Sequence, residues 1–229
     1  MSAPKREGAK EGKKHMEALR RAHNQCKRNL IRDHVRSTDR ILDCGCGRGG
    51  DWHKWRSVGY QRLVGVDPEL ESLKEAERRA QELGMRQMML VHGDIHSVQN
   101  LGLFDVVCYN FSIQYILETL EASAEAIANV VRPGGKLIGI TPDFDRIVNF
   151  KSPDALGNTL RLVDSMHIEV KLTDGPFYAD GPREEPIMDR TLLIDVLRPW
   201  FDLVSWTPMI DSTTGLISDI YSTFVFLRK

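Results

Sequence analysis

A glycine-rich segment directly after a short apolar run carries the clearest chemical signal in this chain. Residues 41–42 are apolar, Asp43 follows, glycines stand at positions 45, 47 and 50, and Asp51 comes next. This spacing satisfies G-x-G-x-x-G, in which a strand turns tightly into a helix beside a nucleotide-like cofactor. Carboxylates on both sides of the loop would repel a pyrophosphate but attract an ammonium and a sulfonium group. The loop therefore favours S-adenosylmethionine over a dinucleotide.

Two later apolar runs also end near an acid. Residues 62–66 lead into Asp67, about one helix and one strand after the glycine loop, where a ribose needs a carboxylate to accept both hydroxyl groups. Residues 88–92 lead into Asp94, and in methyltransferases an acid there typically faces the adenine amino group. A simple helix N-cap is the alternative for Asp94.

The alternation of apolar runs with helical segments predicts an α/β fold, a parallel sheet with helices on both faces. With 229 residues the chain can bury a core of its own, and we expect a single domain over residues 13–229. The later strands are expected at 104–109, 131–140, 203–206 and 218–227, with a helix at 189–197.

The regular alternation breaks after the fifth strand. The segment 154–186 contains β-like stretches at 159–163 and 167–172, and turn residues follow from 174 to 182. An insertion at this point lies at the carboxyl edge of the sheet, where α/β proteins bind substrates. We therefore expect residues 154–186 to select the substrate.

Charge is unevenly distributed along the chain. Residues 1–40 contain twelve Lys or Arg against five Asp or Glu, although the whole chain has a formal net charge of −1. Residues 1–12 are predicted to be a disordered basic tail, and an amphipathic helix is predicted from about Glu11 to Val35. The asymmetry favours a polyanionic partner, and a solvated tail is the alternative.

The cysteines and the apolar runs limit the class of protein to which the chain can belong. The four cysteines lack paired C-x-x-C spacing, which argues against a disulfide framework or a zinc site and for reduced thiols inside the cell. No run approaches membrane-spanning length, and the N-terminus has no signal-peptide core. We expect an intracellular protein, nuclear or, in a viral or parasite version, cytoplasmic, with no metal site and no membrane contact.

Extended through Trp55, the glycine loop resembles the G-C-G-K-G-G-D-x-x-K-W signature of mRNA cap guanine-N7 methyltransferases. Residues 21–27 are similar to the family's R-x-x-N-x-x-x-K helix, 104–115 to its F-D-x-x-x-x-Q-F-x-x-H-Y segment, and 139–143 to its G-T-T-P-N/D turn. The resemblance implies a Rossmann-like class I methyltransferase with a mostly parallel seven-stranded sheet. The implied reaction is methyl transfer from S-adenosylmethionine to N7 of the terminal guanosine of GpppN-capped RNA.

The resemblance also implies which residues form the site. The implied cofactor residues are Lys27, Asp43, Gly45, Cys46, Gly47, Asp67, Asp94, Ile95, Asn110, Ser112 and Tyr115. The implied cap residues are Arg48, Lys54, Gln114, Tyr115, Glu185 and Tyr221. The chain departs from the family at Gln114, Arg48 and Asn110, where histidine, lysine and glutamine are usual.

The implied reaction needs no catalytic side chain of its own. N7 of guanine carries a lone pair and no proton, so it can attack the sulfonium methyl in line without a general base. A carboxylate that accepts from guanine N1–H and the amino group would stabilise the positive charge that grows on the ring. Glu185 is the candidate, and Glu184 is its rival.

Two other function classes remain open from the sequence. One is a class I methyltransferase acting on another small molecule, RNA or protein, and the other is a non-catalytic subunit of a capping enzyme. The expected partners are capped RNA or a cap dinucleotide, with other capping enzymes or RNA polymerase as further candidates. We expect a monomer.

Overall fold

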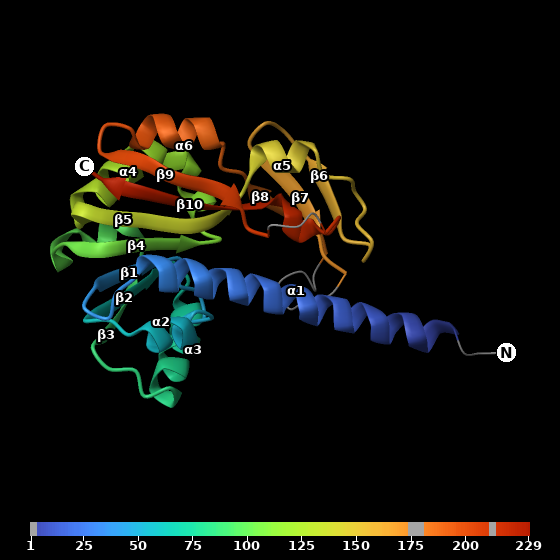
Figure 1. The fold of residues 1–229 in the computed structure, drawn as a ribbon, viewed down its shortest axis with the longest axis horizontal. Helices are drawn as coiled ribbons and strands as arrows, with labels where there is room; N and C mark the ends of the chain where they lie inside the picture. The colour runs from blue at the N-terminus through green and yellow to red at the C-terminus, as the bar shows by residue number, and fades with distance from the viewer. Residues whose placement is uncertain (1–3, 174–180, 211–213) are drawn as a thin grey trace.

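The computed structural model describes residues 4–173, 181–210 and 214–229. Its main sheet has seven strands in the order β3-β2-β1-β4-β5-β10-β9 (Figure 1). All neighbours are parallel except β10, which runs antiparallel to both β5 and β9. The predicted seven-stranded, mostly parallel sheet is confirmed. The strands are β1 Arg40–Cys44, β2 Arg62–Asp67, β3 Met88–His92, β4 Phe104–Asn110, β5 Val131–Pro142, β9 Phe201–Pro208 and β10 Tyr221–Arg228.

Helices cover both faces of the main sheet, and successive strand residues point to opposite faces. Leu42 packs in the core under α4 and α6, whereas Ile41 packs in the core under α1, α2 and α3. Because both faces are buried, the central strands read as continuous apolar runs. The helices are α1 Pro4–His34, α2 Trp52–Val58, α3 Leu70–Glu82, α4 Leu120–Val130, α5 Phe144–Val148 and α6 Arg190–Leu197.

The segment after β5 forms a small antiparallel sheet of its own. Its strands are β6 Thr159–Leu162, β7 His167–Lys171 and β8 Arg183–Pro186, in the order β6-β7-β8. Residues including Leu160, Ile168 and Ile187 pack with Ile217 and Ile220 into a third apolar cluster. The strands β6 and β7 were predicted from the sequence. Of the turn predicted over residues 174–182, residues 174–180 lie outside the described residues.

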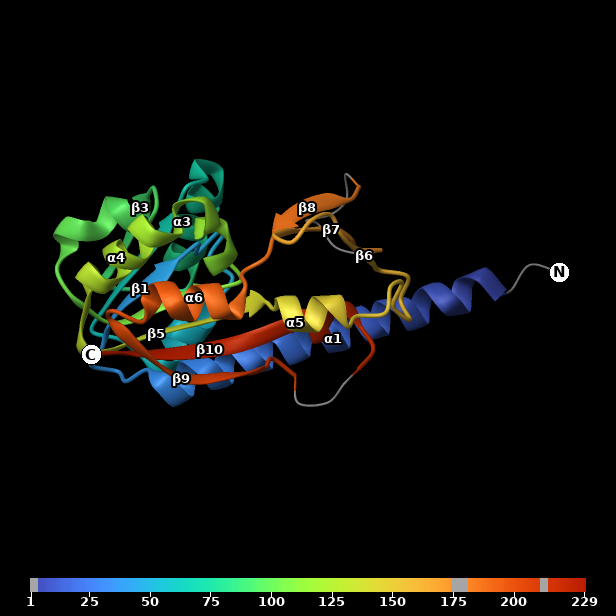
Figure 2. The ribbon, with the colours of Figure 1, turned by 90° about the horizontal axis from the view of Figure 1, so that it is seen from above.

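The N-terminal helix α1 is longer than predicted. It begins at Pro4 and extends beyond the body of the molecule at its N-terminal end (Figures 1 and 2). The structure thus has helix at residues 4–12, where a disordered tail was expected. Proline is favoured at the first helical position, Lys, Arg, Glu and Ala are good helix formers, and extending an existing helix avoids the cost of nucleation.

The insertion sheet lies at the end of the main sheet from which the N-terminal part of α1 extends (Figure 2). Within the described residues, no helix combines the length and the apolar character needed to cross a membrane.

Candidate functional site

A cavity of about 710 Å³ lies where α1, the carboxyl ends of β4 and β5 and the insertion sheet meet. The cavity brings together the glycine loop, the N-terminal helix and the insertion. Of the predicted site residues, it is lined by Lys27, Gly45, Asn110, Gln114, Tyr115, Glu185 and Tyr221.

Buried Asp51 organises the wall of the cavity beside the glycine loop. Its carboxylate accepts from Lys27 Nζ at 3.0 Å, from Lys54 Nζ at 2.8 Å and from Asn110 Nδ2 at 3.1 Å. Burial alone would raise the pKa of Asp51, but Lys27 and Lys54 hold it below its ordinary value. The carboxylate is therefore charged at neutral pH and fixes the amide of Asn110.

Two amide oxygens at the cavity are buried acceptors that lack a hydrogen-bond partner among the described residues. They are Asn110 Oδ1 and Gln114 Oε1. Asn110 Nδ2 donates to the Asp51 carboxylate and Gln114 Nε2 donates to the Phe111 carbonyl at 3.1 Å, and both of these groups can only accept. The orientation of both amides is thus fixed, and both oxygens suit a donor such as the ammonium group of a bound amino acid.

The glycine loop approaches the cavity closely at Gly45. Its φ of +70° is left-handed, and a Cβ there would collide with the side chain of Ser112. The Ser112 hydroxyl donates to the Cys44 carbonyl at 2.6 Å and holds the two segments together. Glycine is therefore required both by conformation and by space.

Asp67 holds the same loop from the end of β2. One carboxylate oxygen accepts from Gly47 N–H at 2.8 Å, and the other accepts from Glu69 N–H at 3.0 Å. Each oxygen keeps a second lone pair. The predicted ribose contact fits this arrangement and stays a prediction.

Asp43 lies behind the loop and does not line the cavity. It accepts from Trp55 Nε1 at 2.9 Å and is almost fully buried. Burial, followed by the charge of Asp51, raises the pKa of Asp43 to about 7. One carboxylate oxygen of Asp43 thus binds the Trp55 indole, and the expected cofactor contact of Asp43 stays a prediction. Trp52 and Trp55 themselves are fully buried, as core residues.

Asp94 caps the 3₁₀ segment Ile95–Leu101, which the sequence analysis gave as its alternative role. It accepts from His96 N–H at 2.9 Å and exchanges contacts with Ser97. Ile95 is buried in the core beneath α4 and α6, and Cys46 is buried on the opposite side of the main sheet. A contact of Asp94 and Ile95 with adenine stays a prediction.

The wall opposite the glycine loop comes from β8 and Tyr115. Tyr115 is exposed, and its hydroxyl donates to Glu185. Glu184 is exposed and lies outside the cavity, because adjacent strand residues point to opposite faces. Between the two predicted candidates, the structure places Glu185 at the cavity.

An aromatic cluster forms the floor between α1 and β10. Phe111 lies edge-on to Tyr221 at 4.9 Å and stacks on His23 at 5.9 Å, measured between ring centroids. Lys27 Nζ lies 5.0 Å from the Phe111 ring centroid. Phe111 has a φ of +64°, so its neighbours hold it in a strained conformation at the cavity.

Two predicted cap residues lie away from the cavity. Arg48 is exposed on the glycine loop, and Lys54 is buried against Asp51. The ammonium of Lys54 neutralises a buried carboxylate, and the implied cap contacts of Lys54 and Arg48 stay predictions.

Several lining residues escaped the sequence analysis. Arg20, His23 and Asn24 lie on the same face of α1 as the predicted Lys27, at helical spacing, and Arg183 lies on β8. The three- and four-residue steps along α1 were the available signal, but they were interpreted only for apolar packing.

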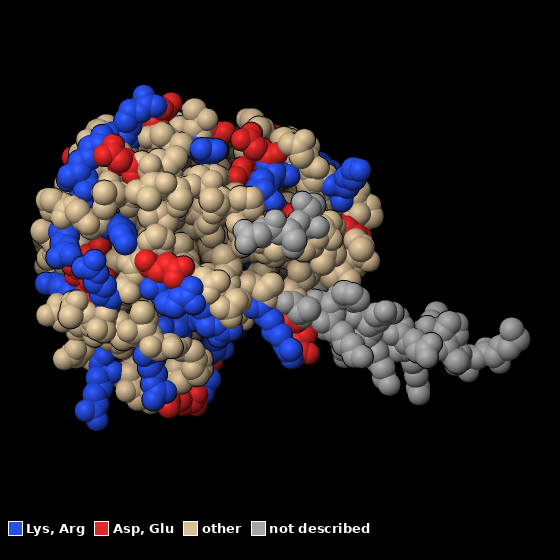
Figure 3. Space-filling model, in the orientation of Figure 1, with Lys and Arg blue, Asp and Glu red and all other residues tan. Residues whose placement is uncertain are grey.

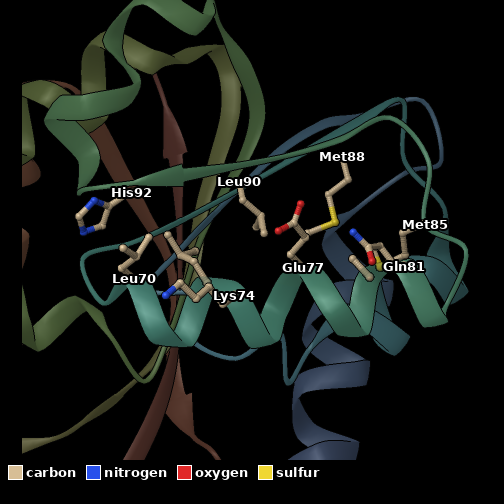
Figure 4. A pocket seen from close by; sticks show the side chains of 10 residues that line it. Leu70, Lys74, Glu77, Gln81, Met85, Met88, Leu90 and His92 are labelled. Atoms are coloured by element: carbon tan, nitrogen blue, oxygen red, sulfur yellow. The ribbon is translucent and has the colours of Figure 1, made fainter.

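A second cavity, of about 440 Å³, lies between α3 and the edge strand β3. Leu70, Lys74, Glu77 and Gln81 approach it from α3, with Met88, Leu90 and His92 on the other side (Figure 4). None of the predicted site residues lines this cavity.

Comparison with known proteins identifies the family. The family model described as mRNA (guanine-N(7))-methyltransferase domain matches residues 4–171. The chain belongs to this family. Within the mRNA (guanine-N(7))-methyltransferase domain family, the mRNA cap guanine-N(7) methyltransferase of Eremothecium gossypii is 35% identical over 147 residues, which are 56% of this chain and 34% of that protein. The Saccharomyces cerevisiae enzyme of the same name is 30% identical over 145 residues, 56% of this chain and 33% of that protein. The chain thus matches about a third of the length of these relatives.

The fold agrees with this family. The crystal structure of an S-adenosylmethionine-dependent methyltransferase from Clostridium acetobutylicum superposes with a TM-score of 0.64 at 17% identity, covering 90% of this chain and 89% of that one. This likeness shows that the chain has the class I methyltransferase fold.

Proposed function

We propose that this chain transfers a methyl group from S-adenosylmethionine to N7 of the terminal guanosine of GpppN-capped RNA. One observation carries the proposal: a single cavity joins the glycine loop to Glu185 and Tyr115. A methyl donor beside Gly45 and a guanine beside Glu185 would therefore share one space. The relatives named as mRNA cap guanine-N(7) methyltransferases support the same reaction.

The cofactor would be held by groups with complementary charge. The ammonium of Lys27 suits the carboxylate of the methionine portion, and the acceptor oxygens of Asn110 and Gln114 suit its ammonium group. Asp67 suits the ribose hydroxyls, and Asp94 with Ile95 suits the adenine. S-adenosylmethionine supplies the electrophilic methyl group.

The guanine would be selected by hydrogen bonding. The Glu185 carboxylate accepts one bond from Tyr115 and has further lone pairs for guanine N1–H and its amino group. Adenine offers an acceptor at N1, so it would meet the carboxylate with the wrong polarity. The rings of Tyr115 and Tyr221 border the same cavity, and stacking on one aromatic ring contributes about 1–3 kcal/mol.

The residues accelerate transfer by alignment and electrostatics, without a general base. Holding the nucleophile and the methyl group in line can lower the barrier by roughly 7–11 kcal/mol. Positive charge moves onto guanine during transfer, so the bonds from guanine to Glu185 strengthen in the transition state.

Capped RNA is the proposed partner, and the basic run along α1 supports an approach of its backbone from that side. Contacts with other capping enzymes or RNA polymerase, and the monomeric state, stay predictions.

The test is a methyl-transfer assay with labelled S-adenosylmethionine and three acceptors: GpppA, ApppA and GTP. We expect label on GpppA and none on ApppA. A protein that binds the cofactor but labels ApppA as well as GpppA is a methyltransferase of different specificity. A protein that binds no cofactor supports the non-catalytic subunit instead.

A further inference from the structure

The strand β3 forms one edge of the main sheet and pairs only with β2 among the described residues. Just before the strand the Gln87 carbonyl accepts a hydrogen bond from β2, and just after it Gly93 N–H donates one to β2. In a parallel ladder alternate residues bond to the same neighbour. The N–H and C=O groups of Met88, Leu90 and His92 therefore point away from β2, and β3 offers this row of groups to a further strand.

This edge lacks the features that usually prevent another strand from binding. Edge strands are commonly protected by lysines, prolines or bulges. The sequence of β3 is Met-Met-Leu-Val-His, and its register with β2 is regular. Met89 is 38% exposed. An exposed apolar edge of this kind is suited to binding an extended segment of another protein.

An apolar groove lies along one face of the edge. It is the cavity of about 440 Å³ between α3 and β3 (Figure 4). The apolar part of its lining consists of Leu70, Leu73, Ala80, Met85, Met88 and Leu90. Its charged side chains are Lys74 and Glu77, one of each sign. Side chains of an added strand that point into this groove would therefore be apolar and uncharged.

Two arginines lie beside the start of β3. Arg40 and Arg62 line a further cavity, of about 430 Å³, together with Met89, and they are direct neighbours on β1 and β2. Arg40 donates to the Leu101 carbonyl at 2.8 Å and lies over the Phe104 ring. Arg62 Nη2 lies 3.8 Å from Met89 Sδ. These partners are neutral, and neither arginine forms an ion pair among the described residues, so an acidic partner would complement both.

The arginines and the apolar groove lie on opposite faces of the sheet. Met88 pairs in register with Leu63, which belongs to the core beside α3, whereas Met89 pairs with Val64, which belongs to the core beneath α4. The Arg62 side chain reaches Met89 and thus extends toward the open edge. The whole chain has a formal net charge of −1, and Figure 3 shows both signs interspersed over the face in view. The unbalanced arginine pair is therefore a local feature.

We propose that β3 binds an extended segment of a partner protein in which apolar residues alternate with acidic ones. The segment adds to the sheet antiparallel to β3, the slightly more stable pairing. Its apolar side chains enter the groove against α3, and its acidic side chains face Arg62 and Arg40. An RNA strand would match the arginines but would leave the apolar groove and the row of backbone groups unused. The inference does not rest on the proposed function, because the main cavity shares no lining residue with this edge.

The probe is a fluorescein-labelled peptide, Val-Thr-Val-Glu-Val-Glu, which places valines opposite Met88, Leu90 and His92 and glutamates opposite Gln87 and Met89. Its binding to the full chain is measured by fluorescence anisotropy. One matched peptide has lysines in place of both glutamates, and another carries a methyl group on the backbone nitrogen of the central valine. A labelled single-stranded RNA of mixed sequence is titrated in parallel.

The protein variants are Arg62→Glu and, as the matched control, Arg36→Glu, which makes the same charge change at an exposed residue outside both cavities at β3. Thermal unfolding of each variant verifies that it is folded. Amide hydrogen exchange over residues 86–93 is followed with and without the glutamate peptide.

We expect the parent to bind the glutamate peptide saturably and each matched peptide at least about tenfold more weakly, since one loses the charge contacts and the other a backbone hydrogen bond. Arg62→Glu should prefer the lysine peptide, and Arg36→Glu should behave like the parent. The glutamate peptide should slow amide exchange in β3, because it bonds to the outward N–H groups.

Four results would overturn the inference. The first is no binding of the glutamate peptide, and the second is equal binding of the methylated peptide, which would exclude strand addition. The third is RNA binding that Arg62→Glu abolishes while the peptides do not bind, which would make this edge an RNA contact. The fourth is a dimer in sedimentation that Met89→Lys dissociates and that the peptide does not compete with, which would place a second copy of the chain on β3.

Discussion

Replacing Glu185 with glutamine tests the base-recognition site most sharply. The substitution keeps the size of the side chain and one carbonyl acceptor, but it removes the charge and turns one acceptor into a donor. Tyr115 already donates to one carboxylate oxygen, so the guanine must use the remaining acceptor sites. Glutamine therefore loses at least one charge-assisted hydrogen bond, which contributes about 1.5–3 kcal/mol. Even 1.4 kcal/mol of lost transition-state stabilisation lowers the rate about tenfold.

The assay is the initial rate of methyl transfer to GpppA at saturating cofactor, with cofactor affinity measured by calorimetry. We expect Glu185→Gln to lower kcat/KM at least about tenfold and to bind S-adenosylmethionine like the parent. Glu184→Gln is the matched control, because its exposed side chain on the same strand lies outside the cavity. Full activity of Glu185→Gln, or a larger loss in Glu184→Gln, would refute the reasoning.

Three further predictions concern the cofactor and the RNA. Asp67→Ala should weaken S-adenosylmethionine binding at least about tenfold in calorimetric titration, since it removes charge-assisted ribose contacts. Burial and the charge of Asp51 raise the pKa of Asp43 to about 7, above its value of about 4 in the unfolded chain. Protonated Asp43 therefore contributes its full stabilisation below about pH 4, and this stabilisation is lost as the pH rises to about 7. In urea unfolding, Asp43→Asn should therefore gain up to about 4 kcal/mol relative to the parent across that range, at about 1.4 kcal/mol per pKa unit. Deleting residues 1–15, which leaves Arg20 in place, should raise the KM for capped RNA and leave the KM for GpppA unchanged. The salt dependence of the KM for capped RNA should become shallower, because fewer phosphate contacts release fewer counterions.

Each of these predictions has a contradicting result. Unchanged cofactor affinity in a folded Asp67→Ala protein would mean that the acid after β2 does not reach the ribose. A stability difference between Asp43→Asn and the parent that stays constant from about pH 4 to pH 8 would show that Asp43 does not hold its proton in the folded protein. Equal effects of the deletion on GpppA and on capped RNA would point to damaged folding.

The central sheet was predictable because the burial of each strand determines the residue types within that strand's own short segment. β1, β2 and β4 are buried on both faces, so each reads as a short continuous apolar run. The strand β8 was not predicted as a strand, since its sequence Arg-Glu-Glu-Pro is polar and one face lines a charged cavity. A strand whose inner face is functional lacks the alternation that identifies strands.

A site residue was predictable where its own backbone conformation requires a particular residue type, as at Gly45. Contacts between side chains that are distant in the sequence were harder to predict. The resemblance implies Lys54 as a cap residue, and only the fold shows that Lys54 neutralises buried Asp51. Asp43 lies at the expected end of β1, and only the fold shows that Trp55, twelve residues later on α2, donates to one of its carboxylate oxygens. The spacing on α1 shows which residues share a face, and only the fold shows that the cavity lies against it.

The position of the transferred methyl group tests the central claim most directly. The protein is incubated with methyl-labelled S-adenosylmethionine and GpppA, and the product is separated by chromatography against m7GpppA and against ribose-methylated standards. The cavity geometry predicts that all label elutes with m7GpppA. Label on a ribose, on the adenosine or on no cap product in a protein that binds the cofactor would contradict the proposed function.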